Sequence, residues 1–343
     1  MRAIRLHAFG PAENLLFEEV PDPVPAAGEV LIEVAAAGVH VLDTVLRQGI
    51  AGPGPGPAVL PTVPGREVAG TVSAVGPGAD PAWAGRRVVA HIGMNPGGYA
   101  ERIAVPAERL HEVPEGLDAA AAVAMIGTGR TALGIVQFAE PGPDDVVVVP
   151  AAAGGLGTLL VQHARNAGAV VVGLAGGAAK VARVRAAGAD LAVDYREPGW
   201  AGTVRAFLDA GAGRPGTPRG ATIVYDGIGG DTARAAVDLL APGGAHVVFG
   251  WFGHADPLDA GPHRPDETYL KERGISSREV LGPVMLERAG GENPLRTLEL
   301  RSLSLAARGL LVPAVTRYPL AEAARAHREL EDRLTVGKVV LEP

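Results

Sequence analysis

A glycine-rich turn follows a run of valines in the middle of the chain, and residues of this kind can hold a phosphate. The valines occupy positions 146–149, and the turn Pro-Ala-Ala-Ala-Gly-Gly-Leu-Gly-Thr follows at 150–158. Ala152 replaces the first glycine of the usual G-x-G-x-x-G pattern, but Gly154 still lets the backbone approach a pyrophosphate, and Gly157 lets a helix pack closely on a strand. The free N–H groups at the start of that helix would point at the phosphates. We therefore predict a dinucleotide site, with a packing turn that binds no ligand as the alternative.

The end of the next predicted strand indicates which dinucleotide binds. A site selective for NAD places Asp or Glu there, where the carboxylate holds the ribose 2′-hydroxyl. Residues 173–180 contain no acidic residue, and Lys180 can pair with the 2′-phosphate of NADPH. A solvated helix lysine is the other interpretation of Lys180, so the missing carboxylate is the stronger reason to predict NADPH.

Strands and helices alternate around this turn as they do in a doubly wound parallel sheet. The predicted strands are 144–149, 169–174, 191–195, 221–226 and 246–250, with a sixth near 274–280. The predicted helices are 157–167, 179–187, 202–211 and 231–240. Residues 253–270 are rich in Pro, Gly, Asp and His, so we expect a loop outside the carboxyl ends of the strands.

The two ends of the chain have short β-rich runs between turns, a pattern typical of an all-β domain. The predicted elements are strands at 30–34, 68–72, 310–313 and 336–341, a helix at 320–330 and an exposed Gly-Pro loop at 51–57. We expect the tail to complete a first, barrel-like domain.

Composition and charge exclude several classes of protein. Hydrophobic residues make up 47% and charged residues 20% of the chain, which favours a buried core over disorder. The net charge of −7 argues against a nucleic-acid surface and against docking on anionic lipid. The chain has no cysteine, which excludes disulfides and thiolate metal sites, and it has no uninterrupted apolar stretch of about 20 residues. We expect a cytoplasmic protein without nucleic-acid or membrane partners.

Several segments in a fixed order carry a family resemblance. They are AGVHVLDTVLRQG at 37–49, VPGREVAG at 63–70, GGYAE at 97–101, AAGGLG at 152–157, DGIGG at 226–230 and LEDRLTVGKVVL at 330–341. Over nearly its whole length the chain resembles the zinc-free quinone oxidoreductase branch of the medium-chain dehydrogenase/reductase superfamily. The resemblance implies a Rossmann doubly wound parallel sheet at 124–284, inserted in a GroES-like, mostly β catalytic domain at 1–123 and 285–343. It also implies a homodimer.

The resemblance further implies a set of cofactor contacts. These are Gly155 and Leu156 with the pyrophosphate, Gly176, Lys180 and Tyr195 around the 2′-phosphate, and Thr131, Phe249, Gly250 and Arg333 near the nicotinamide half or the rest of the cofactor. Without the resemblance, Tyr195 reads equally well as a strand-end tyrosine and Arg333 as a surface charge.

Zinc is not expected. Zinc-dependent members of the superfamily bind the catalytic metal through a Cys, a His and a second Cys, and the matching positions here are His40, Arg66 and Gly127. A guanidinium cannot bind a cation, so one possible ligand remains. The His and Asp residues at 254–263 have no ligand spacing and are interpreted as a polar loop. Without a Lewis acid, hydride transfer to an electron-poor quinone or enone is easier than reduction of an unactivated ketone.

His40 is the candidate proton donor. It replaces the asparagine common in the branch, and an imidazole can donate and titrate near neutral pH. The alternative is that His40 packs in the cleft or orients the cofactor amide. Asp43 can orient His40 or the cofactor ribose, or it can cap a helix that starts at Thr44. Val45 stands where many members have a tyrosine near the substrate, and the Trp-Phe pair at 251–252 either lines an aromatic pocket or only packs.

These observations predict an NADPH-dependent enzyme that transfers hydride to a small quinone or conjugated carbonyl compound without zinc. An enoyl or alkenal double-bond reductase on the same scaffold is the alternative, because both would use the same hydride donor. A nucleotide-binding scaffold without turnover is a third possibility, since the fold alone does not determine function.

Overall fold

The computed structural model describes every residue except 51–58, 94–95, 213–215, 217 and 252–263. Contacts divide the chain into two compact units. The β unit comprises Met1–Gly129, Glu299–Arg308 and Pro313–Pro343, and the α/β unit comprises Arg130–Leu298 and Gly309–Val312. These divisions fall later in the chain than the expected boundaries at 123/124 and 284/285. The reason is that two helical segments, Ala119–Val136 and α11 (Pro294–Ala307), each begin in one unit and end in the other.

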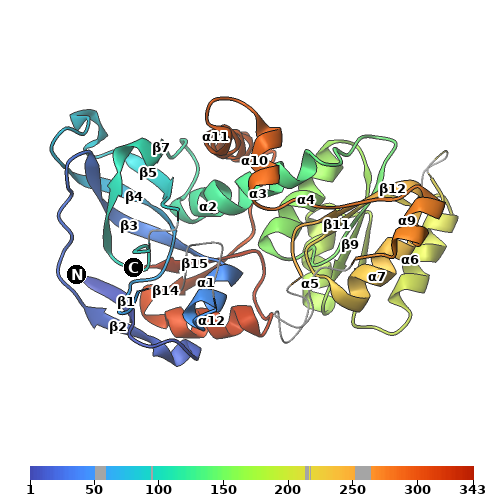
Figure 1. Ribbon diagram of the computed structural model, residues 1–343, viewed down its shortest axis with the longest axis horizontal. Coiled ribbons are helices and arrows are strands. Elements are labelled where there is room, and N and C mark those ends of the chain that lie inside the picture. Colours follow the sequence, from blue (N-terminus) through green and yellow to red (C-terminus); the bar gives the residue numbers. More distant parts are fainter. Residues whose placement is uncertain (51–58, 94–95, 213–215, 217, 252–263) are drawn as a thin grey trace. The chain divides into compact units, whose positions relative to one another are not determined.

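A seven-stranded sheet forms the centre of the β unit (Figure 1). Its order is β14-β15-β3-β4-β5-β7, with β6 beside β3, and β14 and β15 are its parallel pair. The strands are β3 (Glu29–Val39), β4 (Glu67–Val75), β5 (Arg87–His91), β6 (Arg102–Pro106), β7 (His111–Glu112), β14 (Val315–Pro319) and β15 (Lys338–Glu342). A separate antiparallel pair consists of β1 (Arg2–Leu6) and β2 (Leu15–Glu19). The helices are α1 (Val41–Arg47), α2 (Ala119–Ala124) and α12 (Ala323–Glu331), and a π-helical turn, η4 (Met125–Gly129), follows α2.

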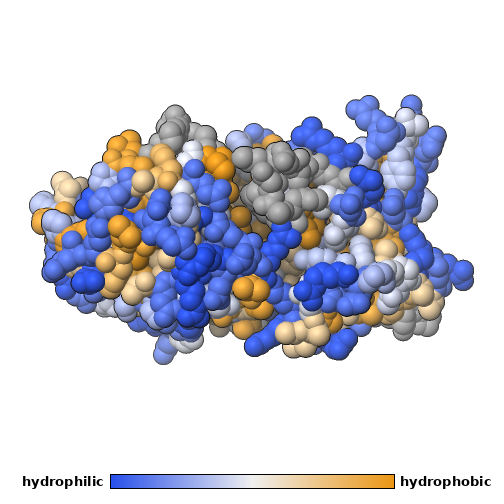
Figure 2. Space-filling model, turned by 90° about the horizontal axis from the view of Figure 1, so that it is seen from below, coloured by the Kyte–Doolittle hydropathy of each residue, from blue (hydrophilic) through white to orange (hydrophobic). Residues whose placement is uncertain are grey.

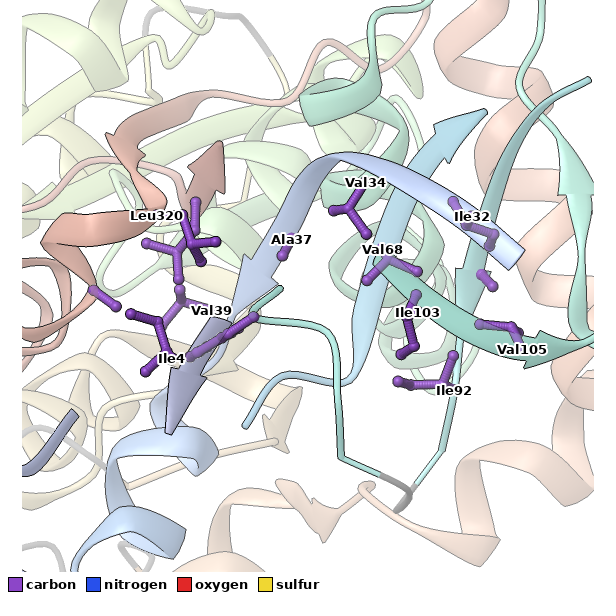
Figure 3. Close-up of a cluster of buried hydrophobic side chains, with 14 of the residues drawn as sticks. Ile4, Ile32, Val34, Ala37, Val39, Val68, Ile92, Ile103, Val105 and Leu320 are labelled. Carbon is purple, nitrogen blue, oxygen red and sulfur yellow. The ribbon is translucent and has the colours of Figure 1, made fainter. Parts of the chain in front are cut away.

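Alternating side chains along the strands fill the core of the β unit. Ile32 and Val34 on β3 point to the same face, as residues two apart on a strand must, and both are buried. Figure 3 shows them near Val68 of β4, Ile103 and Val105 of β6. Each such side chain stabilises the folded state by about 1.5–3 kcal/mol relative to exposure. This core fixes the positions of the strand ends, and the polar residues of the candidate site lie at those ends.

The α/β unit contains a six-stranded, fully parallel sheet in the order β10-β9-β8-β11-β12-β13. The strands are β8 (Val146–Val149), β9 (Val170–Ala175), β10 (Leu191–Asp194), β11 (Ala221–Asp226), β12 (Leu240–Val248) and β13 (Ser276–Glu279). The helices are α3 (Arg130–Val136), α4 (Gly155–Asn166), α5 (Ala178–Ala186), α6 (Trp200–Asp209), α7 (Gly230–Asp238), α9 (Glu267–Arg273) and α10 (Pro283–Ala289). The strand order reverses between β8 and β11, and ligands of doubly wound sheets bind at such a point.

The sequence predicted the six parallel strands and four of the helices between them correctly. The central strands β8 and β9 are rich in valine and buried on both faces, which gives a clear pattern. It was wrong about 310–313, which is not a strand. The backbone N–H and C=O of Val312 bond instead to the side chain of Gln162 on α4, and the strand forms later, at β14. It was also wrong about the end of 253–270, because Asp266 caps α9 by accepting hydrogen bonds from the N–H groups of Thr268 and Tyr269. The expected loop at 51–57 lies outside the described residues.

One helical stretch, Ala119–Val136, is long and apolar enough to cross a membrane by composition alone. The protein buries 83% of it, as it would bury any core helix. On the face drawn in Figure 2, most of the described surface is hydrophilic, and apolar residues form small separate groups.

Candidate functional site

The glycine-rich turn predicted from the sequence connects β8 to α4 in the α/β unit. Helix α4 starts at Gly155 with Gly154 as its N-cap. Ala151 has a φ of 51°, and the N–H of Gly154 donates to its carbonyl oxygen over 2.9 Å. A Cβ on Gly157 would lie 2.4 Å from that same oxygen, so only glycine lets α4 approach the turn this closely. The first N–H groups of α4, including those of Gly155 and Leu156, have no acceptor within the helix and can bind an anion.

The end of β9 holds the residues predicted around the adenosine half of the cofactor. The hydroxyl of Tyr195 lies 3.2 Å from the place that a Cβ on Gly176 would take, so the two residues are neighbours and a larger residue at 176 would press on the ring. Lys180 lies in the first turn of α5, the helix that follows Gly176. The structure therefore brings Gly176 and Tyr195 together and places Lys180 on the adjoining helix.

Two charged residues from the end of β10 also reach this place, and sequence reasoning missed both. Asp194 Oδ2 accepts a hydrogen bond from the N–H of Gly177 over 2.8 Å, and Arg196 Nη2 lies 3.2 Å from the same oxygen. Hydrogen bonds from Arg196 lower the pKa of Asp194 to about 2. The end of β9 itself has no acidic residue, as the sequence shows, but a carboxylate from the next strand lies near it, and a guanidinium offsets the charge of that carboxylate.

Phe249 and Gly250 follow β12 at the carboxyl edge of the parallel sheet. The N–H of Phe249 donates to the carbonyl oxygen of Asp226 over 2.8 Å, and a Cβ on Gly227 would lie 2.4 Å from the Phe249 ring. Gly227 therefore admits the ring beside the end of β11. Thr131 lies in α3 and is half-buried. The roles of these residues toward a cofactor stay predictions.

His40 lies beside two buried charged residues of the β unit that sequence reasoning also missed. Its Nε2 is 2.7 Å from Glu67 Oε1 and 2.9 Å from Lys338 Nζ, and Nζ is 2.8 Å from Glu67 Oε2. Glu67 is fully buried and Lys338 is 4% exposed, whereas the His40 side chain is 24% exposed. The antiparallel pairing of β15 with the end of β3 brings Lys338 next to His40. We call these three residues the ion triad.

Two glycines make room for the carboxylate of the ion triad. A Cβ on Gly127 would lie 1.4 Å from Glu67 Oε1, and a Cβ on Gly38 would lie 2.4 Å from Oε2. Gly127 belongs to the π-helical turn η4, and such turns occur often at functional sites. The Glu67 carboxylate therefore occupies the space that a side chain at position 127 would fill.

The charges of the ion triad depend on one another. Burial works to raise the pKa of Glu67, but the charges of His40 and Lys338 outweigh it and hold that pKa well below its usual range. Burial lowers the pKa of Lys338, and Glu67 opposes this fall. Removing Glu67 or Lys338 alone would leave the other as an uncompensated buried charge, which typically costs about 3–5 kcal/mol.

Asp43 fixes the backbone at His40. Helix α1 begins at Val41 and not at Thr44 as expected, because Asp43 accepts a hydrogen bond from the backbone N–H of His40 over 2.7 Å and so caps the helix from its first turn. Its other oxygen lies 3.3 Å from Arg66 Nε. The sequence therefore correctly predicted that Asp43 caps a helix, but it placed the start of that helix three residues too late. The prediction that Asp43 lies beside His40 agrees with the hydrogen bond to the His40 backbone.

Tyr99 connects Asp43 to the buried His327. The Tyr99 hydroxyl donates to Asp43 Oδ2 over 3.2 Å and lies 3.2 Å from His327 Nε2, so that nitrogen must donate to the hydroxyl. Burial lowers the pKa of His327 to about 4, with Asp43 opposing and Arg47 assisting the fall. His327 is therefore neutral at pH 7.

Arg333 is exposed after α12 in the β unit, with a φ of 56°. Phe252 and the His and Asp residues at 254–263 lie outside the described residues. Within the described part of the chain, no group of three or more His, Cys, Asp or Glu residues is placed to hold a metal ion.

The missed residues left weak signals in the sequence. Glu67 and Lys338 each stand next to apolar strand residues, in VPGREVAG and VGKVVL, where a charge is unexpected unless it is paired. Arg196 directly follows Tyr195, so the reasoning that placed Tyr195 near the 2′-phosphate could also have identified Arg196 as a cation there. The pairing of Glu67 with Lys338 depends on sheet topology, which no local pattern reports.

Comparisons with known proteins agree with this architecture. The alcohol dehydrogenase GroES-like domain family matches residues 26–115, and the zinc-binding dehydrogenase family matches 155–281. A 2-haloacrylate reductase of Burkholderia is 32% identical, with 98% of each chain covered. A quinone oxidoreductase of Pseudomonas aeruginosa is 31% identical, covering 100% of this chain and 99% of that one. The crystal structure of Escherichia coli quinone oxidoreductase complexed with NADPH has a TM-score of 0.82 at 28% identity, with both chains covered completely.

We expect acid to destabilise the protein through His327. Its pKa is about 4 when folded and about 6.5 when unfolded, so between these values the unfolded chain binds the extra proton. The contribution of His327 is complete above pH 6.5 and is lost as the pH falls towards 4, with a loss of roughly 2 kcal/mol between pH 7 and pH 5. Urea unfolding at both pH values measures this. In His327→Gln, whose amide can still donate to Tyr99, the loss should be smaller by that amount, and an unchanged loss would contradict the assignment.

Proposed function

The chain belongs to the quinone oxidoreductase branch of the medium-chain dehydrogenase/reductase superfamily, and on this premise we propose that it is an NADPH-dependent oxidoreductase that reduces a small quinone or conjugated carbonyl compound without zinc. The observation that carries the proposal is the strand–turn–helix at β8 and α4. Its close approach at Gly157 and its free helical N–H groups suit a pyrophosphate. The bound nicotinamide would supply the hydride, and the protein would supply binding, orientation and a proton.

NADPH is favoured over NADH by the charges at the ends of β9 and β10. Lys180 and Arg196 are the cations there, and Asp194, which would repel a phosphate if it were unpaired, is bonded to Arg196. Gly176 leaves room beside the Tyr195 hydroxyl. Gly155 and Leu156 would hold the pyrophosphate through their N–H groups. The NADPH complex of the related Escherichia coli enzyme supports the same choice.

Independence from zinc is supported by what surrounds His40. A zinc ligand must offer a lone pair to the metal, but His40 Nε2 already lies 2.7 Å from the Glu67 carboxylate and 2.9 Å from the Lys338 ammonium. Arg66 cannot serve as a ligand, and Glu67 already fills the space next to Gly127. The residues present therefore do not fit a catalytic zinc, and no step of the reaction is derived through one.

The acceptor is an electron-poor double bond or a quinone in either of the two leading versions of the proposal. Hydride adds to the acceptor carbon, negative charge develops on the conjugated oxygen, and a proton must then arrive there. His40 is the candidate donor because its side chain is partly exposed while its backbone is fixed by Asp43. The name of the Burkholderia relative favours reduction of a conjugated double bond, and the other names favour a quinone.

Turnover by purified protein tests the proposal. NADPH should be oxidised, followed at 340 nm, in the presence of 1,4-naphthoquinone, of an α,β-unsaturated ketone or of 2-chloroacrylate, and a chelator should not slow it. The acceptor with the highest kcat/KM separates quinone from double-bond reduction. Binding of NADPH without oxidation by any acceptor would favour the non-catalytic scaffold, and stoichiometric zinc in the purified protein would overturn the metal-free chemistry.

Cofactor selectivity gives a sharper prediction. Lys180→Ala and Arg196→Ala should each raise the KM for NADPH about tenfold, because each removes a charge-assisted contact to the 2′-phosphate, while the KM for NADH should change less than about twofold. Arg183→Ala, which removes an exposed cation from the same helix as Lys180, is the control. Equal effects on both cofactors would remove these residues from the 2′-phosphate site.

We also propose a cytoplasmic homodimer that pairs through β13. Among the described strands, β13 is one of the two edges of the parallel sheet, and the exposed apolar residues Leu281 and Val284 follow it. The N–H of Val280 donates to Val248 of β12, so the N–H of Glu279 points away from the sheet and is available to a second β13.

Light scattering should therefore report about twice the chain mass of 34.9 kDa. Glu279→Pro removes the outward N–H and should shift the protein towards the monomer, whereas Glu279→Ala, which keeps that N–H, should not. A monomeric wild type, or a proline variant that dimerises as well as the alanine variant, would contradict the proposed interface.

A further inference from the structure

The α/β unit contains a small cavity on one face of its parallel sheet. The volume of this cavity is about 250 Å³, and residues of β12 and β13 form part of its wall. The residues that line it include Phe138, Ala245, Val247, Ser276, Arg278 and Arg288. The proposed function uses none of these six side chains, although two of them are cations.

The sheet turns three small side chains and one arginine towards this cavity. Ala245 and Val247 lie on the same face of β12, because residues two apart on a strand share a face. Parallel pairing sets these two residues beside Ser276 and Arg278 of β13, respectively. The small side chains leave space above the sheet, and Ser276 adds a hydroxyl to the wall of the cavity.

Helix packing brings the second arginine to the same place. A Cβ on Gly134 of α3 would lie 2.2 Å from Sδ of Met285, so glycine lets this side chain of α10 reach α3. Phe138 comes four residues after Gly134, and Arg288 comes three residues after Met285. Residues three or four apart lie on the same side of a helical turn. The packing of α10 on α3 therefore sets Arg288 beside the Phe138 ring.

Both guanidinium groups lie over the Phe138 ring. Arg288 Cζ is 4.9 Å and Arg278 Cζ is 6.0 Å from the ring centroid, distances at which the face of the ring attracts a cation without neutralising it. Within the described part of the chain, neither guanidinium forms an ion pair or a hydrogen bond. Glu279, the acid next to Arg278, points to the other face of the sheet and pairs with Arg264 over 2.7 Å. Two positive charges therefore meet at one cavity, and the described residues supply no counter-charge there.

We propose that this cavity binds a small organic dianion, either a short dicarboxylate or a phosphate monoester. Each guanidinium has a planar set of N–H donors that matches the oxygens of a carboxylate or a phosphate. A charge of −2 balances Arg278 and Arg288, and the Ser276 hydroxyl can donate one further hydrogen bond. The volume suits a ligand of a few carbon atoms and is too small for a whole dinucleotide.

The cavity is separate from the predicted 2′-phosphate site and from the edge of the sheet. The 2′-phosphate site lies at the ends of β9 and β10, and two strands, β8 and β11, stand between β9 and β12. Neighbouring strands are about 4.8 Å apart, which puts about 14 Å between β9 and β12. Pairing of β13 with a second β13 would use backbone groups in the plane of the sheet, whereas Ser276 and Arg278 point out of that plane. The dianion therefore does not compete with the cofactor for the same cations.

Calorimetric titration of the protein with succinate at pH 7 and low salt tests the site without any turnover. Arg278→Gln and Arg288→Gln should each weaken binding about tenfold, because each removes a charge-assisted contact, and the double variant should weaken it further. Acetate, which has one charge, should bind about tenfold more weakly than succinate. Both arginines are exposed, so the double variant should keep the wild-type fold, which circular dichroism checks.

Two further double variants and one single variant separate the cavity from general attraction to a charged surface. Arg234→Gln with Arg301→Gln is the matched control, because it removes two exposed arginines of α7 and α11 that do not line the cavity. This control should bind succinate as the wild type does, and so should Lys180→Ala with Arg196→Ala. Ala245→Leu adds bulk inside the cavity without changing any charge, and it should weaken binding at least about tenfold.

Glycerol 3-phosphate, titrated into the Lys180→Ala with Arg196→Ala variant, shows whether a phosphate monoester fits better than a dicarboxylate. Absence of wild-type binding to both succinate and glycerol 3-phosphate at millimolar concentration would overturn the proposal. Equal losses in the double Arg278 and Arg288 variant and in the matched control would overturn it as well. Binding by Glu279→Pro but not by the wild type would also count against it, because a second copy of the chain would then fill the cavity.

Discussion

A carboxylate removed from water must have a compensating charge beside it, and Glu67 imposes this condition on the β unit. The condition is met by Lys338, which comes from the far end of the sequence, and by His40 at the start of α1. The tail must therefore return to the central sheet and pair β15 with β3 before the charge is balanced. Glycine at positions 38 and 127 is part of the same requirement, because any side chain there would displace the carboxylate.

The two units contribute different chemistry. In the α/β unit, backbone N–H groups and small residues dominate, as suits a ligand whose main features are phosphates. The β unit contributes side chains that can hold or pass a proton, and it keeps them in two networks. The ion triad includes the partly exposed His40. The Tyr99–His327 pair is buried, and burial keeps the His327 imidazole neutral at pH 7. Asp43 accepts hydrogen bonds from both the Tyr99 hydroxyl and the backbone N–H of His40. The position of His40 in the ion triad therefore depends on the packing of the Tyr99–His327 pair.

Sequence patterns predicted the parallel sheet well because its central strands are buried on both faces and give continuous valine runs. They failed at 310–313, where apolar residues looked like a strand but their backbone bonds to Gln162. For the site, glycines with a steric role, such as Gly157, could be found from spacing alone. Glu67 and Lys338 could not, because a buried ion pair between distant segments has no local signature. Arg196 was missed because the argument stopped at β9, although the sheet order places β10 directly beside it.

The short segment Gly309–Val312 has a consequence for anyone who wishes to isolate the nucleotide-binding half of this protein. The segment belongs to the α/β unit although it lies beyond Leu298, where the rest of that unit ends. Its backbone is held by two amide side chains of α4, Gln162 and Asn166, through three hydrogen bonds of 2.6–2.9 Å. A fragment cut at Arg130 and Leu298 would leave both amides facing water with no backbone to hold. The α/β unit is therefore not one continuous segment of the chain, and a stable isolated fragment must also include the four residues Gly309–Val312.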